Sequence, residues 1–437
     1  MLIRFRVSNF LSFKDEVEFS MIPGRTKQRL DHIVLGGSGR KDIALLRSAV
    51  IYGANAAGKS NFVKALGFAK RLVLRGIQAR KPIPIKPFKL DANSSAQPSK
   101  FEFEIRRNGS DYLYGFEINE TQILAEWLHQ IKKTTSAIIF ERKTDTKEKT
   151  FVEFGNNIKF ENKKDKEFLE FVARGTRSNQ LFLTESIDRE VRYFQDVYEW
   201  FEKLTVVYPE SRYDLDLDVT SESTNAMVKY LEKVGTGICG FDLQRMSPET
   251  EIPKNVLDDV AKEIKPGEQI SLMENIRGQR YLVSKSKQGE LETSKLMLKH
   301  KMVDCNDDVL FDTAEESDGT IRLMDLLPIV TKPEKEPRVY VIDELDRSLH
   351  PNLCYQLIQD FLAKPGQSQL IVTTHESNLL TFDLLRRDEI WFVEKDERGA
   401  TALYSLEEYT PRYDKDIQKG YLLGRFGAIP IIGKKPF

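Results

Sequence analysis

The chain has 437 residues, with 66 lysines and arginines against 67 aspartates and glutamates, and a formal net charge of −1. This length allows two or three domains with a large core, and the balanced charge excludes a uniformly basic nucleic-acid-binding coat, although a local basic face remains open. The widely separated Cys239, Cys305 and Cys354 indicate a reducing compartment and no structural zinc. Because no apolar run approaches the roughly 20 residues that span a bilayer, we expect a cytoplasmic protein that makes no membrane contact.

Strands dominate the predicted elements of the first 160 residues. Alternation of apolar and polar side chains predicts two antiparallel hairpins, and three more strands are expected to follow the second hairpin. The dipeptide Asn108-Gly109 is the turn signal of that second hairpin. The expected strands are residues 3–7, 17–19, 101–105, 112–118, 127–132, 137–142 and 150–154.

The middle of the chain is predicted to be mainly helical, over residues 163–205, 225–234 and 254–264. It shows no sustained heptads, so no long coiled coil is expected. Tyr198, Trp200 and Phe201 are interpreted as a core stripe. Two basic groups are candidate contacts to DNA or RNA, although interleaved acidic residues favour solvated helix and loop faces. These groups are Lys163–Lys166 with Arg174 and Arg177, and the run Lys285–Lys301.

Residues 53–60 read Gly-Ala-Asn-Ala-Ala-Gly-Lys-Ser, a complete G-x-x-x-x-G-K-[ST] phosphate loop between an apolar run at 49–52 and a helix-like stretch from residue 61. Such a loop wraps its backbone N–H groups around a phosphate chain at the positive end of the following helix. Lys59 would add a charge near the β- and γ-phosphates, and Ser60 would bind Mg²⁺. The motif therefore predicts ATP and Mg²⁺ as ligands. The expected nucleotide contacts are Gly53, Asn55, Ala56, Ala57, Gly58, Lys59, Ser60 and Asn61.

The block from residue 316 to residue 437 alternates strand and helix, and it contains two short apolar runs of the buried parallel type. The first run, 339–342, ends in Asp343 and Glu344. We expect Asp343 to bind Mg²⁺ and Glu344 to polarise the water that attacks the γ-phosphate. The second run, 370–372, leads to His375 at a strand's carboxyl end, where ligands of open α/β sheets bind. His375 is therefore a candidate γ-phosphate contact.

The order of these motifs, with Ser317-Asp318-Gly319 before a predicted helix, is that of an ABC-type ATPase head. More narrowly, the chain resembles the SMC/RecF-like branch, and within it the RloA-type AAA ATPases of bacterial anti-phage and abortive-infection systems. The opening strand, phosphate loop, signature, carboxylate strand, His375 region and tail carry this resemblance. The matching segments are residues 6–13, 52–60, 316–320, 343–351, 373–377 and 424–430.

The resemblance implies an α/β fold: an ABC-type P-loop head with a mixed β lobe, a parallel-sheet RecA-like lobe and a helical insertion. The expected parts are an N-terminal half-head, 1–160, a mainly helical insertion, 161–300, and a C-terminal half-head, 301–437. By resemblance Ser348 lies in the D-loop that crosses a dimer interface. Relatives often carry an arginine where this chain has Leu11. Gln180 is the candidate for the glutamine that joins Mg²⁺ to the attacking water.

In this class Ser317 and Gly319 contact the γ-phosphate that a second subunit holds, so the resemblance implies head-to-tail pairs or larger homo-oligomers with sandwiched ATP. The leading hypothesis is an ATPase whose nucleotide state controls a separate nuclease effector, Toprim-like or other, in anti-phage defence. The residues after His375 contain no D-x-D with an upstream glutamate, H-N-H or H-E-x-x-H pattern, which favours a separate effector. The alternatives are a RecF-like DNA-repair ATPase and a nucleotide-gated scaffold with little turnover; a transporter subunit fits the opening and D-loop segments poorly.

Overall fold

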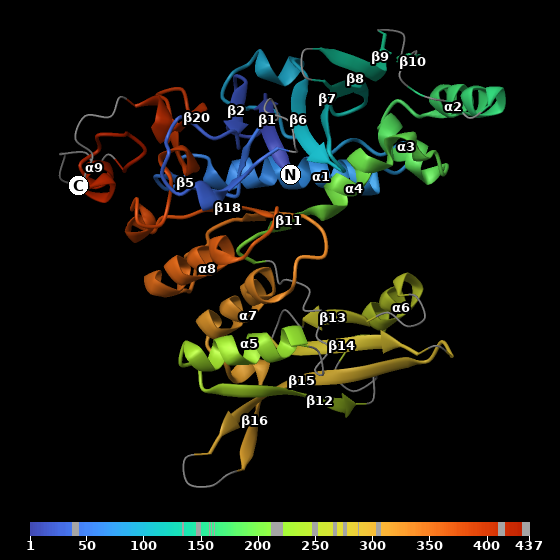
Figure 1. The fold of residues 1–437 in the computed structure, drawn as a ribbon. Helices are drawn as coiled ribbons and strands as arrows, with labels where there is room; N and C mark the ends of the chain where they lie inside the picture. The colour runs from blue at the N-terminus through green and yellow to red at the C-terminus, as the bar shows by residue number, and fades with distance from the viewer. Residues whose placement is uncertain are drawn as a thin grey trace. The chain divides into compact units, whose positions relative to one another are not determined.

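A computed structural model gives the arrangement of the chain (Figure 1). It describes residues 1–36, 43–132, 135–145, 150–156, 158, 160, 162–210, 222–246, 252–264, 269–273, 278–286, 288–302, 307–409 and 416–430. The contacts divide the chain into two compact units. The first unit comprises Met1–Tyr208, Glu336–Leu345 and Pro365–Phe437, and the second comprises Pro209–Lys335 and Asp346–Lys364.

A seven-stranded antiparallel sheet in the first unit has the order β10-β9-β8-β7-β6-β1-β2. It confirms both predicted hairpins: Phe5 lies opposite Phe19 in the first, and Asn108 and Gly109 turn the second with φ angles of 49° and 75°. Positive φ at both turn positions matches the twist of the flanking strands. The strands are β1 Leu2–Ser8, β2 Val17–Ser20, β6 Ser99–Arg107, β7 Ser110–Ile118, β8 Ile123–Ile131, β9 Ser136–Thr144 and β10 Thr150–Phe154.

A six-stranded sheet of the first unit, in the order β11-β17-β18-β5-β19-β20, joins segments from both ends of the chain. All its neighbours are parallel except β20, which runs antiparallel to β19. Both predicted parallel strands are confirmed as β17 and β18. The strands are β5 Ser48–Gly53, β11 Leu204–Val207, β17 Val339–Ile342, β18 Gln369–Thr373, β19 Ile390–Lys395 and β20 Thr401–Ser405, and a separate small sheet pairs β3 Ile33–Val34 with β4 Leu45–Leu46.

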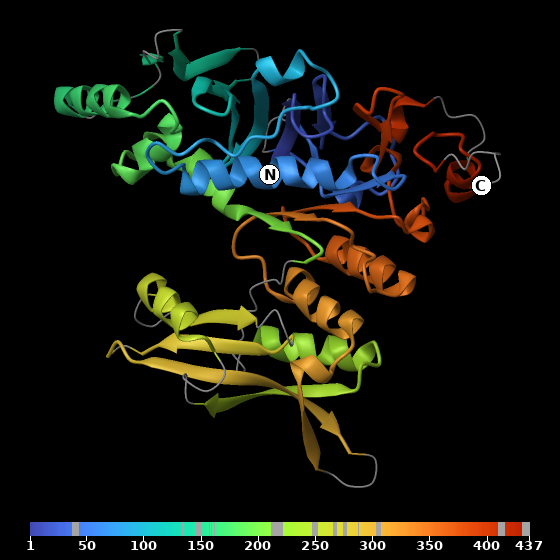
Figure 2. The ribbon, with the colours of Figure 1, turned by 180° about the vertical axis from the view of Figure 1, so that it is seen from behind.

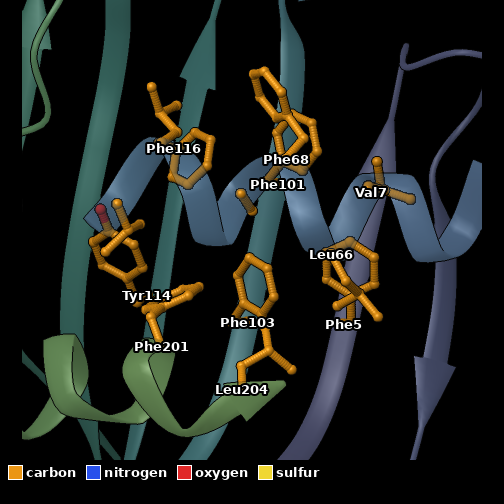
Figure 3. Packing of buried hydrophobic residues seen from close by; sticks show 14 of the residues in the cluster. Phe5, Val7, Leu66, Phe68, Phe101, Phe103, Tyr114, Phe116, Phe201 and Leu204 are labelled. Atoms are coloured by element: carbon orange, nitrogen blue, oxygen red, sulfur yellow. The ribbon is translucent and has the colours of Figure 1, made fainter. Parts of the chain in front are cut away.

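Helix α1, Lys59–Arg75, belongs to one hydrophobic core with side chains from both of these sheets (Figures 2 and 3). Phe62 packs edge-on against Phe5 of β1, and Phe68 lies 5.4 Å from Phe101 of β6 between ring centroids. Burying each such ring contributes roughly 1.5–3 kcal/mol, so this packing fixes the helix that follows the phosphate loop. The other helices of this unit are α2 Lys163–Gly175, α3 Phe182–Asp188, α4 Gln195–Lys203 and α9 Ile417–Leu422.

The predicted core stripe around Trp200 is confirmed. Trp200 and Phe201 of α4 are buried, and the Phe201 ring packs edge-on against Phe103 of β6 with centroids 5.1 Å apart. Among the described residues the longest helix is α1, with 17 residues, so this part of the chain contains no long coiled coil.

The second unit contains a five-stranded antiparallel sheet in which β15 pairs with β12 along one edge and with β14 and β16 along the other. Helix α6 packs its apolar residues against Tyr281 and Val283 of β14. The strands are β12 Ile238–Met246, β13 Gln269–Met273, β14 Arg280–Lys285, β15 Leu291–Lys301 and β16 Asp308–Asp312, and the helices are α5 Glu222–Lys233, α6 Lys254–Glu263, α7 Asp318–Thr331 and α8 Pro351–Ala363.

The prediction of a mainly helical insertion over 161–300 is wrong for its second half. Helices α2 to α6 do lie in this range, but β12, β13, β14 and β15 occupy much of 238–301. The units also divide after Tyr208, rather than after residue 160, and α8 groups with the second unit.

The basic run Lys285–Lys301 lies on strands β14 and β15 and the turn between them, and its residue 287 lies outside the described residues, as does Cys305. Three of its lysines form ion pairs: Lys295 with Asp312, Lys299 with Asp242 and Lys301 with Glu232. Among the described helices, none is long and apolar enough to cross a bilayer.

Candidate functional site

The phosphate loop joins the carboxyl end of β5 to the start of α1. Ala56 and Gly58 adopt left-handed backbone conformations, with φ angles of 61° and 123°. A Cβ atom at Gly58 would lie 2.5 Å from Oγ1 of Thr401, so only glycine fits this position. Among the residues that the structure describes, no side chain caps the N-terminus of α1. Its first backbone N–H groups are therefore suited to an anion, as the motif predicts.

Lys59 is 5% exposed and lies inside this loop. Its Nζ atom donates hydrogen bonds to the carbonyl oxygens of Gly53, at 2.7 Å, and Ala54, at 3.2 Å. The same atom lies 3.5 Å from Nδ1 of His375. The structure thus brings together a lysine and a histidine that are 316 positions apart in the sequence.

Ser60 and Asp343 meet beside the loop. Oγ of Ser60 donates a 3.2 Å hydrogen bond to Oδ1 of Asp343, and Asp343 is 2% exposed at the end of β17. A hydroxyl and a carboxylate are hard oxygen ligands of the type that Mg²⁺ binds, while water and phosphate oxygens supply its remaining positions. The two side chains therefore fit the predicted Mg²⁺ site.

Glu344 and His375 line the same cavity as the phosphate loop, with a volume of about 450 Å³. The Glu344 backbone has a φ of 49°, an unusual conformation for a residue other than glycine, and such strain is concentrated at functional sites. Its N–H donates to Oγ1 of Thr373 at 2.9 Å, which fixes the backbone next to Asp343. The lining residues are Asn55, Ala56, Ala57, Gly58, Lys59, Ser60, Asn61, Lys64, Glu344, His375 and Lys395.

A hydrogen-bonded clasp connects the phosphate loop to the opening segment and to β20. Oγ of Ser12 accepts from Nδ2 of Asn61 and from Oγ1 of Thr401, both at 2.7 Å. Oγ1 of Thr401 also lies 2.9 Å from the carbonyl oxygen of Ala57. These hydrogen bonds therefore hold Ser12 and Thr401 against the glycine turn.

A second cavity, of about 320 Å³, shares Asn61 and Lys395 with the first. Its walls combine apolar side chains with two further lysines and include Leu11, where relatives often carry an arginine. The lining residues are Leu11, Ser12, Asn61, Lys86, Pro87, Phe88, Lys89, Leu90, Lys395 and Gly399.

The sequence did not predict four residues at or beside these cavities, which are Ser12, Thr401, Lys64 and Lys395. Lys395 ends β19, a strand with a buried apolar run, and β19 is parallel to β5. The rule that ligands bind at the carboxyl ends of parallel strands would have selected it, as it selected His375.

The signature residues lie in the second unit. Ser317 is the N-cap of α7, and its Oγ accepts from the N–H of Thr320 at 3.1 Å. A Cβ atom at Gly319 would lie 2.6 Å from the carbonyl oxygen of Ser348, so the signature and the D-loop segment are in close contact. Ser317 and Ser348 are exposed. The structure therefore gathers these three residues at the N-terminus of one helix.

The assignment of Gln180 as a Mg²⁺ partner is wrong in this structure. Its Oε1 accepts from the N–H of Ile77, beyond the C-terminal end of α1, whereas Ser60 lies in the first turn of that helix. A helix of this length spans about 25 Å. Gln180 instead fixes the turn after α1, and its own carbonyl oxygen accepts from buried Arg142.

A phosphate loop at the carboxyl edge of a parallel sheet, with a serine–aspartate pair and a glutamate at one cavity, defines a P-loop nucleoside triphosphatase. Residues 48–227 and 269–381 match the family described as "AAA domain, putative AbiEii toxin, Type IV TA system". This match spans more than half of the chain, and the protein belongs to that family. The expected AAA ATPase is thereby confirmed, and membership implies nucleotide hydrolysis.

Solved structures with similarity to the chain include two SMC heads. One is described as the "SmcHead bound to the C-winged helix domain of ScpA", with 13% identity, a TM-score of 0.40, and coverage of 92% of this chain and 97% of that chain. The other is the SMC head domain from Thermotoga maritima, with 13% identity, a TM-score of 0.35, and coverage of 92% and 98%. No curated protein matches the chain.

Proposed function

We propose that the protein binds and hydrolyses ATP between two copies of its head and that the nucleotide state controls a separate nuclease effector, Toprim-like or other, in anti-phage defence. One observation carries the ATPase part of this proposal. Lys59, Glu344 and His375 line a single cavity, at which Ser60 also meets Asp343, although these residues come from three distant segments of the sequence.

Each of these side chains has a place in hydrolysis of the γ-phosphate. The loop N–H groups and Lys59 would bind the phosphate chain. Ser60 and Asp343 would hold Mg²⁺, which when bound would supply positive charge to the phosphate oxygens. Glu344 accepts a proton from the attacking water as the bond between the γ-phosphorus and the bridging oxygen breaks. The products are ADP and inorganic phosphate. His375, beside Lys59, contacts the γ-phosphate.

The second cavity is suited to the nucleoside. It adjoins the phosphate cavity through Asn61 and Lys395, and Leu11, Phe88 and Leu90 supply apolar surface for a base. Pockets for small ligands combine apolar walls with a few polar groups that fix orientation. Lys395, at the boundary between the two cavities, then lies where the ribose and the first phosphate meet. It provides a positive charge there, as the arginine that relatives often carry at the position of Leu11 would.

The signature residues supply the contact to a second copy. Ser317, Gly319 and Ser348 form an exposed group at the N-terminus of α7, and we assign to this group the γ-phosphate of ATP bound by the partner head. ATP that touches both heads favours the closed pair, and hydrolysis removes this differential contact. Association is then a switch that the nucleotide controls.

Light scattering on a Glu344→Gln variant tests this proposal. We expect ATP with Mg²⁺ to raise the molecular mass to that of a pair or a larger oligomer, whereas ADP leaves it unchanged. Adding Ser317→Asp should abolish this rise, because aspartate also caps a helix but its charge repels phosphate. Ser317→Asn, a neutral cap, is the matched control. An unchanged mass with ATP contradicts the sandwich, unless the nucleotide-free protein already forms head-to-tail pairs.

The effector part of the proposal is supported by the family description, which refers to a type IV toxin–antitoxin system. Affinity purification from the native host, followed by mass spectrometry, tests it. We expect a nuclease to be recovered, and its activity should differ between the wild-type protein and the Glu344→Gln variant. If duplex DNA instead stimulates ATP hydrolysis with a steep salt dependence and no nuclease is recovered, the DNA-repair alternative replaces it.

A further inference from the structure

His300 and Glu316 form a short contact within the second unit. Nε2 of His300 lies 2.6 Å from Oε1 of Glu316, and their side chains are only 17% and 9% exposed. A hydrogen bond from an imidazole to a carboxylate at this distance is of the strong, charge-assisted kind. The contact joins the end of β15 to the residue that precedes the signature.

The sheet holds the imidazole of His300 in place. The ring stacks on Phe311 of β16, with centroids 4.5 Å apart and planes 29° from parallel. On another side, a Cβ atom at Gly237 would lie 3.2 Å from Nδ1 of the ring, so glycine leaves the ring its space. His300 also occupies a paired position in β15, opposite Ile238 and Val309. These contacts therefore fix the position of the Nε2 atom of His300.

Glu316 transfers this position to the signature. It precedes Ser317, the N-cap of α7, and Gly319 lies against the carbonyl oxygen of Ser348. Restraining Glu316 restrains the direction in which the chain enters α7, and hence the placement of the Ser317 hydroxyl. The sheet, the signature and the D-loop segment are thus connected through one side-chain contact.

We propose that His300 is a positioning residue for the signature, which it orients through Glu316 for contact with ATP held by a second copy. This inference rests on the proposed function. The contact with ATP requires that the Ser317 hydroxyl be placed within about 0.5 Å of its productive position. Substituting a residue that orients a functional group typically lowers activity 10- to 100-fold. We expect the main effect of His300 to be on turnover, because its Nε2 atom contacts the residue that directly precedes the signature.

Three substitutions test the role of His300. His300→Leu removes the donor, and we expect kcat to fall about 10-fold, with loss of the ATP-dependent mass increase in the Glu344→Gln background. The affinity of the unpaired variant for a fluorescent ATP analogue should stay within about 2-fold of the wild-type affinity, because the substitution does not change the first unit, which contains the phosphate loop. His300→Gln can place a donor near the Nε2 position and should restore kcat. Glu316→Ala leaves the imidazole ring packed and should show the same defect. It therefore replaces His300→Leu as the test if His300→Leu fails to fold.

The chain offers a matched control in its first unit. Nε2 of His129 lies 3.0 Å from Oε1 of Glu141, at a similar exposure of the histidine. His129→Leu should leave kcat and association unchanged. The inference is overturned if folded His300→Leu or Glu316→Ala associates and turns over normally, or if His300→Gln is as defective as His300→Leu. A Glu344→Gln protein with intact His300 that shows no association overturns the proposed function itself, and this inference with it.

Discussion

Oγ1 of Thr373 donates a 2.6 Å hydrogen bond to Oδ1 of Asp343. The same hydroxyl accepts the N–H of Glu344 at 2.9 Å, so one side chain fixes both carboxylate residues of the site. Thr373 is fully buried at the end of β18, which is parallel to β17. The two functional carboxylates are therefore held by the neighbouring strand and not only by their own.

Removing this hydroxyl should impair catalysis. Thr373→Val keeps the shape of the side chain but removes the hydrogen bonds to Oδ1 of Asp343 and from the N–H of Glu344, at a cost of about 1–3 kcal/mol in stability. We expect kcat to fall about 10- to 100-fold and the Mg²⁺ requirement to rise, measured by phosphate release over a Mg²⁺ titration. Thr373→Ser retains the hydroxyl and should keep most activity. Wild-type kinetics for Thr373→Val contradict the assigned role.

Lys395 should determine nucleotide affinity. It lines both cavities, and its exposure allows substitution without loss of packing. A hydrogen bond to a charged group contributes about 1.5–3 kcal/mol, so Lys395→Ala should weaken ATP binding by roughly 10-fold or more. Isothermal titration with non-hydrolysable ATP measures this effect. Lys395→Arg should retain affinity and exposed Lys27→Ala should not change it; equal affinities for all variants would place the nucleotide elsewhere.

The sequence predicted the phosphate loop and its partners well because these residues end apolar strands. Asp343, Glu344 and His375 each follow such a run, and parallel strands bring their carboxyl ends to one edge. The Gln180 assignment failed because a buried glutamine has many possible partners, and the sequence does not show that Ile77 supplies one.

Strands β12 to β15 were missed because their pattern is weak in the sequence. In β15 the lysines at 295 and 299 flank the buried segment Leu296–Leu298, and this pattern was interpreted as a solvated basic face of a helix or loop. In β12 the glycine at 240 and the aspartate at 242 lower strand propensity. Pairing across β15 overrides that local preference, since Phe241 lies opposite Leu298 and Leu243 opposite Leu296.

Breaking a buried ion pair in the first unit should strongly destabilise the protein. Glu126 is fully buried and accepts from the N–H groups of Phe182, at 2.6 Å, and Leu183, at 3.0 Å. Arg142 lies 3.5 Å away and also donates to the carbonyl oxygens of Gln180 and Arg177. Burial raises the pKa of Glu126, and the nearby Arg142 charge opposes that rise.

Glu126→Gln should therefore lower the free energy of unfolding by about 3–5 kcal/mol, because it leaves the Arg142 charge buried without a counter-ion. Urea denaturation followed by circular dichroism measures this loss. The double variant Glu126→Gln with Arg142→Met should recover part of it. The control is Lys163→Met, which removes an exposed pair between Lys163 and Glu167. If Glu126→Gln costs less than this control, the Arg142 charge is compensated by its carbonyl partners alone.

Burial of Lys70 should make stability depend on alkaline pH. Its Nζ atom donates to the carbonyl oxygen of Leu204, and desolvation, followed by the charges of Arg338 and Arg75, lowers its pKa from 10.5. Between the lowered folded-state pKa and 10.5 the unfolded chain binds more protons, so the free energy of unfolding attributable to Lys70 rises with pH.

Urea denaturation of the wild type and of Lys70→Met at pH 7 and at about pH 10 tests this dependence. The difference in free energy of unfolding between the two proteins should shift in favour of the wild type at the higher pH. Exposed Lys81→Met should show no such shift, and a shift in the opposite direction for Lys70→Met would mean that its pKa is raised.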